Sequence, residues 1–580
     1  MSATDDSRQT TPDEGATLAR PSWFWGGLAL LGAGLALHVP MYFAMRGIGP
    51  RMGPHMESRG GGAAGTAMTV GMVLVGVGLA LSLAGLVRRI PDPAGRVERY
   101  RVVSEPQAGL TAAHVRLIAA LSLALVVDVM KPATLAFIMP GMRSEYGLTQ
   151  GQVSVLPVVA LTGTVVGSLA WGHLGDRVGR RATVLMSCLV FAATTVCAVM
   201  PTFGWNLVMC FLMGAGAGGL IPIAYAMAAE SLPPRHRGLV MVLQAGLATV
   251  LAYFATSGLA LLLIPAFGWR IMWFAHVPFI GLLLLMNRWL PESPRFLAET
   301  GRIDEARGVG ATYGMVLVAE PAPPVARAES EPRATAGPRT PALPARPHTR
   351  GAPAAGGAPG TGAKAGWMAL FGPRWLRRTL VVGSYALSWG LINWGYMTFL
   401  PTLLKDASVA GSSPNGLLFV SSLLAIPATF LVAVCYTRWS SRKAMVSYGA
   451  LTVAALGLLA ATDMRGGRVL TIGLLALLII GTTGIVAMLA PYTAEIYPTG
   501  VRAAGSGLTA ACTKAGGMFG PPALAALIAQ HSGPRLVALT VALPMAAATF
   551  ALALHGEETA GRDLEEDGEP SEAAIGMPVV

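Results

Sequence analysis

Long apolar segments constrain the fold of this chain more than any other feature of its sequence. A helix needs about 20 consecutive, mostly apolar residues to cross the hydrocarbon core of a bilayer. Fourteen segments of the 580-residue chain meet this requirement: Trp23–Met45, Ala67–Val87, His114–Met139, Val153–Leu174, Ala182–Met200, Phe203–Ala229, Gly238–Pro265, Trp269–Leu290, Leu376–Leu404, Asn415–Trp439, Ala444–Thr462, Val469–Tyr497, Ala503–Gln530 and Leu536–His555. The sequence therefore predicts an all-α polytopic membrane protein with fourteen spans.

The composition agrees with a chain that lies mostly in lipid. Hydrophobic residues account for 53% of the chain and charged residues for only 12%, whereas soluble domains carry about 25% charged residues. Basic cytoplasmic loops explain the net charge of +12, because such loops are rich in Lys and Arg. The sequence has no nucleic-acid-binding motif. We therefore expect the partners of a monomer to be the lipid bilayer and small molecules, and not nucleic acid.

The cysteines give no sign of a metal or redox site. All of them lie in or at the edge of an apolar segment, and none forms a C-x-x-C pair; they are Cys188, Cys197, Cys210, Cys435 and Cys512. Such cysteines act as small apolar packing residues. The sequence thus predicts neither a metal nor another cofactor, and it has no constellation of a nucleophile with a base that would indicate an enzyme.

A short pattern occurs twice in the chain. Residues 229–237 read AESLPPRHR and residues 494–502 read AEIYPTGVR, with Ala-Glu, Pro and Arg at the same offsets. Each copy ends a long apolar segment. An internal repeat in a chain of membrane spans is typical of transporters built from two related halves. The repeat therefore predicts a substrate path between the halves.

Charge and composition divide the chain into parts. Loops rich in Lys and Arg are expected on the cytoplasmic side, which places both termini in the cytoplasm. The predicted location is the plasma membrane. A segment rich in Pro, Ala, Gly, Thr and Arg, about 320–366, is predicted to be a disordered linker. The predicted parts are a disordered N-terminus (1–22), an extra transmembrane hairpin (23–87), a cytoplasmic connector (88–113), a six-helix bundle (114–290), a cytoplasmic loop with the linker (291–375), a second six-helix bundle (376–555) and an acidic, disordered tail (556–580).

A charged loop motif lies between the second and third spans of the first bundle. Residues 172–181 read GHLGDRVGRR. Glycines permit a tight turn there, and Asp176 can pair with basic side chains or with a helix N-terminus. The motif resembles the loop signature G-x-L-x-D-R-x-G-R-[KR] of the major facilitator superfamily. This resemblance implies two six-helix bundles over about 114–555, with the first two spans as an addition. It also implies a cytoplasmic gate that contains Gly172, Asp176, Arg177, Gly179, Arg180 and Arg181.

Three further motifs resemble one branch of that family. Residues 291–297, PESPRFL, are similar to a motif of sugar porters and related metabolite:proton symporters, as are the two repeat copies. Residues 395–404, GYMTFLPTLL, resemble the end of the seventh span in aromatic-acid and organic-acid symporters. The resemblance implies gate contacts by Glu230, Arg237, Glu495 and Arg502. In the second half, the related loop at 439–443 keeps its basic pair but has Arg438 in place of the acid.

Asp128 is the most informative single residue because an ionised carboxylate inside a span is costly. Lys131 follows three residues later on the same helical face, within pairing reach. The two residues form either a proton-coupling site or a neutral structural pair. Aromatic-acid symporters carry D-G-F-D in this span, so here the first acid matches and the second is replaced by Lys131. The resemblance therefore supports Asp128 as the coupling residue and leaves Lys131 to attract an anionic substrate.

Other polar residues inside spans are candidate ligands of a substrate. Lys514 either binds a carboxylate or pairs with an acid such as Glu495. Trp389, Asn393 and Tyr396 share a helical face and, with Trp394, form either a substrate wall or ordinary packing. Gln244 and His276 are predicted to form hydrogen bonds within the bundle, with substrate binding as the alternative.

The resemblance implies secondary transport of a small polar or carboxylated metabolite by proton symport. The fifth span of the first bundle lacks the G-P-x-x-G-G run of drug-efflux antiporters, which favours uptake. Cys210 stands where many relatives have an arginine, so the manner of proton coupling stays open. Efflux on the same fold and a transport-inactive ligand sensor are the alternatives.

Overall fold

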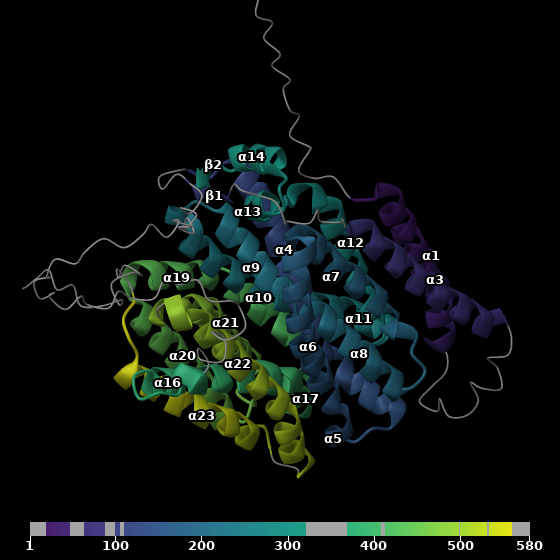
Figure 1. Ribbon diagram of the computed structural model, residues 1–580. Helices are drawn as coiled ribbons and strands as arrows, with labels where there is room; N and C mark the ends of the chain where they lie inside the picture. Colours follow the sequence, from purple (N-terminus) through teal and green to yellow (C-terminus); the bar gives the residue numbers. More distant parts are fainter. Residues whose placement is uncertain are drawn as a thin grey trace, which may run out of the picture.

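The computed structural model describes residues 19–46, 63–87, 99–104, 109–320, 368–407, 412–497, 499–530 and 533–559. Figure 1 shows an assembly of long helices in which the first half, in blue and teal, lies beside the second half, in green and yellow. The predicted linker from 321 onward, the first eighteen residues and the tail from 560 onward lie outside the described residues.

The first half contains the helices that the sequence predicted for one bundle, several of them interrupted. Its elements are α4 (Ala112–Tyr146), α5 (Gln150–Val153), α6 (Val155–Val178), α7 (Arg180–Thr194), η2 (Thr195–Val199), α8 (Phe203–Ala217), α9 (Leu220–Ser231), α10 (Pro234–Phe267), α11 (Ile271–Phe274), α12 (Val277–Leu285) and η3 (Met286–Trp289). Helix α4 packs along α10 and α9, and α6 packs along α8. These contacts bury the apolar faces of the first half against each other.

The second half begins with a span in which a π-helical segment interrupts the α-helix. Its elements are α16 (Leu376–Gly390), the π-helix η4 (Leu391–Tyr396), α17 (Met397–Asp406), α18 (Pro414–Ala425), α19 (Ala428–Val434), the π-helix η5 (Cys435–Trp439), α20 (Ser441–Ala461), α21 (Arg468–Ile496), α22 (Thr499–Ala529) and α23 (Pro534–His555). π-helical turns are uncommon and occur frequently at functional sites. Each π-helix lies next to a helix that contacts the first half: η4 precedes α17, which contacts α4, and η5 follows α19, which contacts α10.

Two helices precede the first bundle, as the sequence predicted. They are α1 (Pro21–Arg46) and α3 (Ala63–Leu86), which pack closely along each other at the right edge of Figure 1. The pair contacts α7 and η2 of the first half. The hydroxyl of Tyr42 donates a hydrogen bond to the carbonyl oxygen of Phe267 at 2.5 Å, and its ring packs edge-on against Phe274. The hairpin is thereby attached to the first half.

A two-stranded antiparallel sheet joins two segments for which the sequence predicts cytoplasmic connections. Strand β1 (Arg99–Ser104) pairs with β2 (Met315–Glu320), with Val102 opposite Leu317. The sheet packs against α13 (Pro294–Glu299) and α14 (Ile303–Thr312) at the top of Figure 1. The all-α prediction therefore missed a small element that connects the segment before the first bundle with the loop after it.

Eleven helices in the described residues are long and apolar enough to cross a membrane, or up to twelve if the bent pair Pro414–Ala425 and Ala428–Trp439 is one span. The set includes Pro21–Phe43 and Thr66–Leu86 of the hairpin. The predicted spans Leu376–Leu404 and Ala503–Gln530 are helical but fall outside this set. The molecule is thus a multi-pass helical membrane protein, and fewer spans than the predicted fourteen meet both criteria.

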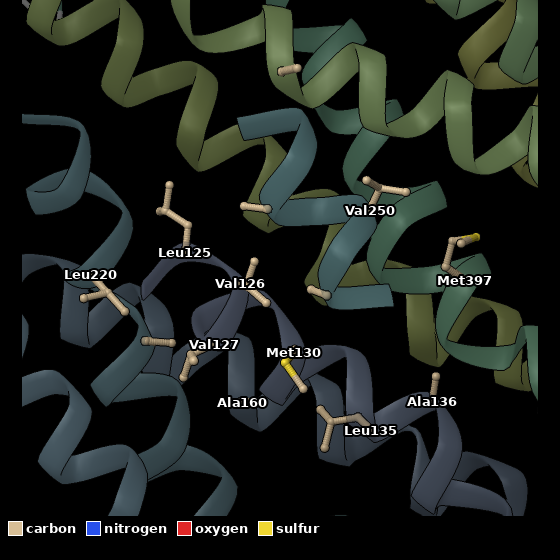
Figure 2. Close-up of a cluster of buried hydrophobic side chains, with 14 of the residues drawn as sticks. Leu125, Val126, Val127, Met130, Leu135, Ala136, Ala160, Leu220, Val250 and Met397 are labelled. Atoms are coloured by element: carbon tan, nitrogen blue, oxygen red, sulfur yellow. The ribbon is translucent and has the colours of Figure 1, made fainter. Parts of the chain in front are cut away.

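The two halves meet along several helices. Helix α10 contacts α18, α19 and α21, α22 contacts α5 and α6, and α17 contacts α4. Figure 2 shows buried apolar side chains of α4, including Val126, Val127 and Met130, with Met397 of α17 in the same cluster. The apolar interface surrounds the stretch of α4 that carries Asp128.

Candidate transport site

Asp128 lies within α4 next to the interface between the halves. Its side chain is 4% exposed, and its Oδ1 atom has no hydrogen-bond partner in the described residues. Lys514 of α22, in the other half, is a basic residue that acts on Asp128 electrostatically, although no ion pair closes between the two. Tyr225 of α9 is also within electrostatic range of the carboxyl group. The carboxyl group is therefore buried with an unused acceptor, which costs free energy unless a ligand or a proton compensates.

The predicted pairing of Asp128 with Lys131 is not formed. Lys131 is fully buried and points into the first half, where Nζ donates to the carbonyl oxygen of Phe191 and, at 2.9 Å, to Oγ1 of Thr194. The ammonium also lies 5.1 Å from the centroid of the Phe191 ring. A spacing of three residues places Asp128 and Lys131 on one face of α4. The long lysine side chain nevertheless reaches the two acceptor oxygens on α7 and not the carboxylate of Asp128. Lys131 is thus part of the core of the first half.

Lys514 bridges the two halves through a hydrogen bond. Its Nζ atom donates to Oγ of Ser168 on α6 at 2.7 Å. The backbone around Lys514 is held tightly against α16, because Cβ atoms at Gly390 and Gly516 would overlap the carbonyl oxygens of Thr513 and Leu387. Glycine is needed where two backbones approach this closely. The ammonium is therefore presented to the first half from a fixed backbone.

The π-helix η4 carries three of the predicted wall residues. Asn393 is buried and accepts a long hydrogen bond, 3.5 Å, from the hydroxyl of Tyr253 on α10. The Trp394 side chain lies against Gly517 of α22, where a Cβ would come within 2.8 Å of the indole Cδ1. Tyr396 is buried, and its hydroxyl has no partner in the described residues. Asn393 is thus the wall residue with a polar contact across the halves.

Two other candidates have structural partners. Trp389 donates from Nε1 to the carbonyl oxygen of Thr482 at 2.8 Å, inside the second half. Gln244 donates from Nε2 to the carbonyl oxygen of Ile118 and to Oγ of Ser122, both at 3.2 Å. These contacts match the packing alternatives of the sequence analysis and leave no side-chain donor of Trp389 for a substrate.

His276, like Gln244, was predicted to bond within its bundle. Its Nε2 atom lies 3.0 Å from Oγ1 of Thr134 on α4, and the side chain is fully buried. The hydroxyl of Thr134 also donates to the carbonyl oxygen of Met130. The histidine therefore fastens α4 to the start of α12.

The charged loop of the first half is built around Glu292. Gly179 has φ +107°, and a Cβ there would overlap Glu292 Oε2, so glycine is required for two reasons. Glu292 Oε1 accepts from the backbone N–H of Arg180 at 2.7 Å and of Arg181 at 3.3 Å, which caps the N-terminus of α7. Burial raises the pKa of the Glu292 carboxyl above its ordinary value, although these N–H donors and the Arg181 charge oppose the shift.

The arginines of this loop have separate partners. Arg180 forms an ion pair with Glu230 at 3.1 Å, as expected for contacts between the repeat and the loop. Arg181 donates to Oδ1 of Asn287 at 2.6 Å. Gly172 and Arg177 lie in the exposed last turns of α6, and the Asp176 side chain lies outside the described part of the structure.

The two repeat copies have the same local geometry. Arg237 donates to the carbonyl oxygen of Leu232 at 3.3 Å, and Arg502 donates to that of Tyr497 at 3.2 Å. Each arginine thus closes the turn within its own copy, five residues back. Neither bonds to the glutamate of its copy in the described structure. The glutamates contact other residues instead, Glu230 with Arg180 of the loop and Glu495 with Tyr436.

The second half has a carboxylate that corresponds to Glu292 of the first half. Glu558 Oε1 accepts from the backbone N–H of Ser441 at 2.9 Å and from Oγ of Ser441 at 2.7 Å, at the N-terminus of α20. Glu495 accepts from Tyr436 at 2.7 Å and from Thr559. Residues 556–559 were predicted to belong to a disordered tail, but they pack on the second bundle. The dipeptide Glu558-Thr559 repeats Glu292-Ser293 after the last span of each half, and this repetition was the missed signal.

Ser168, Tyr225 and Tyr253 were also missed by the sequence analysis. Each is a common polar residue in an apolar run, and the sequence gives no spacing or charge that marks it. They become notable only because the fold brings them to Lys514, Asp128 and Asn393. No group of three or more His, Cys, Asp or Glu side chains able to hold a metal ion exists among the described residues.

Comparison with known proteins identifies the class of molecule. The family model described as Major Facilitator Superfamily matches residues 121–521. The niacin transporter NiaP of Acinetobacter baylyi is 25% identical over 468 residues, which cover 78% of this chain and 96% of that protein. The 4-hydroxybenzoate transporter PcaK of the same organism is 34% identical over 182 residues, 30% of this chain and 39% of that protein.

A solved structure has the same fold. The proton:xylose symporter XylE bound to 6-bromo-6-deoxy-D-glucose is 16% identical, with a TM-score of 0.52, over 78% of this chain and 98% of that chain. These relatives are membrane transporters and not enzymes. The chain belongs to the major facilitator superfamily, which confirms the resemblance drawn from the loop motif and the repeat.

Proposed function

We propose that the protein is a secondary transporter that moves a small carboxylated or otherwise polar metabolite together with protons, by alternating access. The observation that carries the proposal is that Asp128 of α4 is buried with no partner for Oδ1, while Lys514 of α22 reaches across the boundary between the halves to Ser168. Buried ionisable residues at such a boundary are typical of transport pathways. The two halves would move relative to each other around these residues.

Lys514 is the residue proposed to bind the substrate charge. Its ammonium reaches the first half and already holds a neutral hydroxyl there. A carboxylate would be a stronger acceptor than a hydroxyl in a site of low dielectric constant. Niacin and 4-hydroxybenzoate, which give two relatives their names, both carry a carboxyl group, and this supports a carboxylate as cargo. Asn393, Trp394 and Tyr396 would supply the wall of the site.

Asp128 is the residue proposed to bind the coupled proton. Its Oδ1 atom has no partner and is buried, so a proton would remove the cost of an ionised carboxylate. The name of XylE as a proton:xylose symporter supports proton coupling on this fold. Lys131, which is bound inside the first half, is not needed for this step.

The charged loops are proposed to act as cytoplasmic gates. In the first half the gate would consist of Gly172, Asp176, Arg177, Gly179, Arg180, Arg181, Glu230 and Arg237, and in the second half of Glu495 and Arg502 with the Glu558 segment. Both termini would lie in the cytoplasm, and the monomer would cross the plasma membrane fourteen times. The helices α1 and α3 would form the two additional spans.

Proton movement into sealed vesicles tests the proposal. Purified protein would be placed in vesicles, and the external pH would be followed on adding niacin, 4-hydroxybenzoate or xylose. We expect a substrate-dependent rise in external pH with wild type, and none with Asp128→Asn. Uptake of labelled substrate without proton movement would rule out coupling, and outward movement would favour the efflux alternative. Binding without transport would favour the sensor alternative.

A further inference from the structure

The hydrogen bond between Lys514 and Ser168 joins the two halves without a substrate. Ser168 Oγ donates its own proton to the carbonyl oxygen of Thr164 at 2.7 Å, within α6. Its oxygen lone pairs are then free to accept, and the Lys514 ammonium donates to it at 2.7 Å. The hydroxyl therefore acts as a fixed acceptor, oriented by its own helix toward the other half.

Two features make this contact one that a ligand can replace. At the glycine-lined crossing of α22 and α16 the backbone on either side of Lys514 packs directly against α16, so the side chain can change its acceptor without a shift of the helix. A lysine ammonium sits on a flexible four-carbon stem with three donors, so it can change acceptors easily. A buried carboxylate oxygen of Asp128 without a partner lies within electrostatic range of the same ammonium.

We propose that Ser168 is a positioning residue for transport: it holds the Lys514 ammonium between the halves in the empty protein, and the carboxylate of the substrate must displace it. The inference rests on the proposed function of Lys514 as the binder of substrate charge. Ser168 then has two effects that can be separated. It stabilises the arrangement described here, and it competes with carboxylate cargo but not with uncharged cargo.

Substitution of the hydroxyl separates competition from general damage. In Ser168→Ala the ammonium loses its resting acceptor, so the KM for niacin should fall about tenfold or more, in line with a hydrogen bond that involves a charged group. The KM for nicotinamide, which has an amide in place of the carboxylate, should change much less than the KM for niacin. Ser168→Thr, which keeps the hydroxyl, should restore the wild-type KM for niacin. The measurement is uptake by full-length protein in vesicles.

The matched control is Thr162→Ala on the same helix. Oγ1 of Thr162 donates only to the carbonyl oxygen of Val158, one turn back, so its removal should alter neither KM. Equal changes for niacin and nicotinamide in Ser168→Ala, or no change for niacin, would overturn the inference while transport itself remained. Absence of uptake by wild type would contradict the proposed function instead.

A measurement without substrate keeps the inference testable in that case. Spin labels at Glu299 in the first half and Trp439 in the second, both exposed, report the distance between the halves. Ser168→Ala and Lys514→Met should shift the distance distribution of the empty protein alike, and the double variant should shift it no further. Thr162→Ala should not shift it. A distribution that Ser168→Ala leaves unchanged would overturn the role of Ser168 as a tie between the halves.

Discussion

Gly179 lies so close to the carboxylate of Glu292 that any side chain at this position would overlap Oε2. The residue that follows the sixth span of the first half therefore fixes the turn between its second and third spans. The contact links the charged loop motif at 172–181 with the PESPRFL motif at 291–297. It also gives a physical reason for the glycine in the loop signature.

Gly179→Ala should destabilise the protein. At φ +107° a non-glycine residue is strained by about 1–3 kcal/mol, and the overlap with Glu292 adds to this cost. We expect a clear fall in the thermal unfolding midpoint in detergent. Gly172→Ala is the control, because Gly172 has open space around it inside α6 and alanine favours a helix by about 1 kcal/mol. Equal effects of both substitutions would contradict this account of the turn.

The Glu292 carboxyl should give stability a measurable pH dependence. Its pKa in the folded protein is raised above the ordinary value of 4.5, mainly by burial. The folded state thus binds this proton more tightly than the unfolded state does. The resulting stabilisation is fully present below the ordinary pKa and is lost as the pH rises through the raised pKa.

The difference in unfolding midpoint between wild type and Glu292→Gln, measured as a function of pH, isolates the contribution of the Glu292 proton to stability. Glutamine keeps an oxygen acceptor for the N–H groups of Arg180 and Arg181 but does not titrate. We expect the unfolding midpoint of wild type to fall relative to that of the variant as the pH rises above the ordinary pKa of 4.5 and through the raised pKa of Glu292. Parallel profiles over this range would show that the pKa of Glu292 is not raised.

Lys131→Met should leave proton-coupled transport in place. Lys131 is bound to Phe191 and Thr194 inside the first half and does not contact Asp128. A buried ammonium without a carboxylate partner carries a large desolvation cost, and an apolar side chain of similar size removes that cost. We expect an unfolding midpoint that is unchanged or higher, with niacin-driven proton movement retained in vesicles. Loss of proton movement at normal stability would restore the coupling role that the sequence suggested.

Glu558→Ala should weaken the second half. The carboxylate caps α20 through the N–H and hydroxyl of Ser441, and loss of a helix cap costs about 1 kcal/mol, with more for a charged acceptor. Glu299→Ala removes an exposed ion pair with Arg295, which is worth less than about 1 kcal/mol, and serves as the control. Thermal unfolding of both variants distinguishes them. An effect of Glu558→Ala no larger than that of the control would mean that the 556–559 segment does not support the bundle.

The fold was predictable from the sequence where local pattern determines it. Apolar length gave the helices, and the loop signature with the repeat gave the two halves. Strands β1 and β2 were missed because each has only six residues and their partners lie more than 200 residues apart in the chain. Pairing of this kind depends on the folded positions of α13 and α14, which no local pattern records.

The site was predictable only in part. Asp128 and Lys514 stood out because charge is rare inside spans, and the structure brings them near each other from opposite halves. The expected Asp128–Lys131 contact failed because helical spacing fixes the direction of a side chain but not the partner of a long one. The role of Ser168 could not be predicted from the sequence, because it depends on a hydrogen bond from Lys514, which lies 346 residues later in the chain.

The α1–α3 hairpin has a consequence for how motion in this protein can be observed. Its contacts with α7 and η2, together with the Tyr42–Phe267 hydrogen bond, attach it to one half, and the family match begins only at residue 121. A fluorophore or an antibody epitope placed on the hairpin would therefore report the position of the first half. The distance from this label to a second label on the other half would change in each reorientation cycle, although neither label lies in the substrate path.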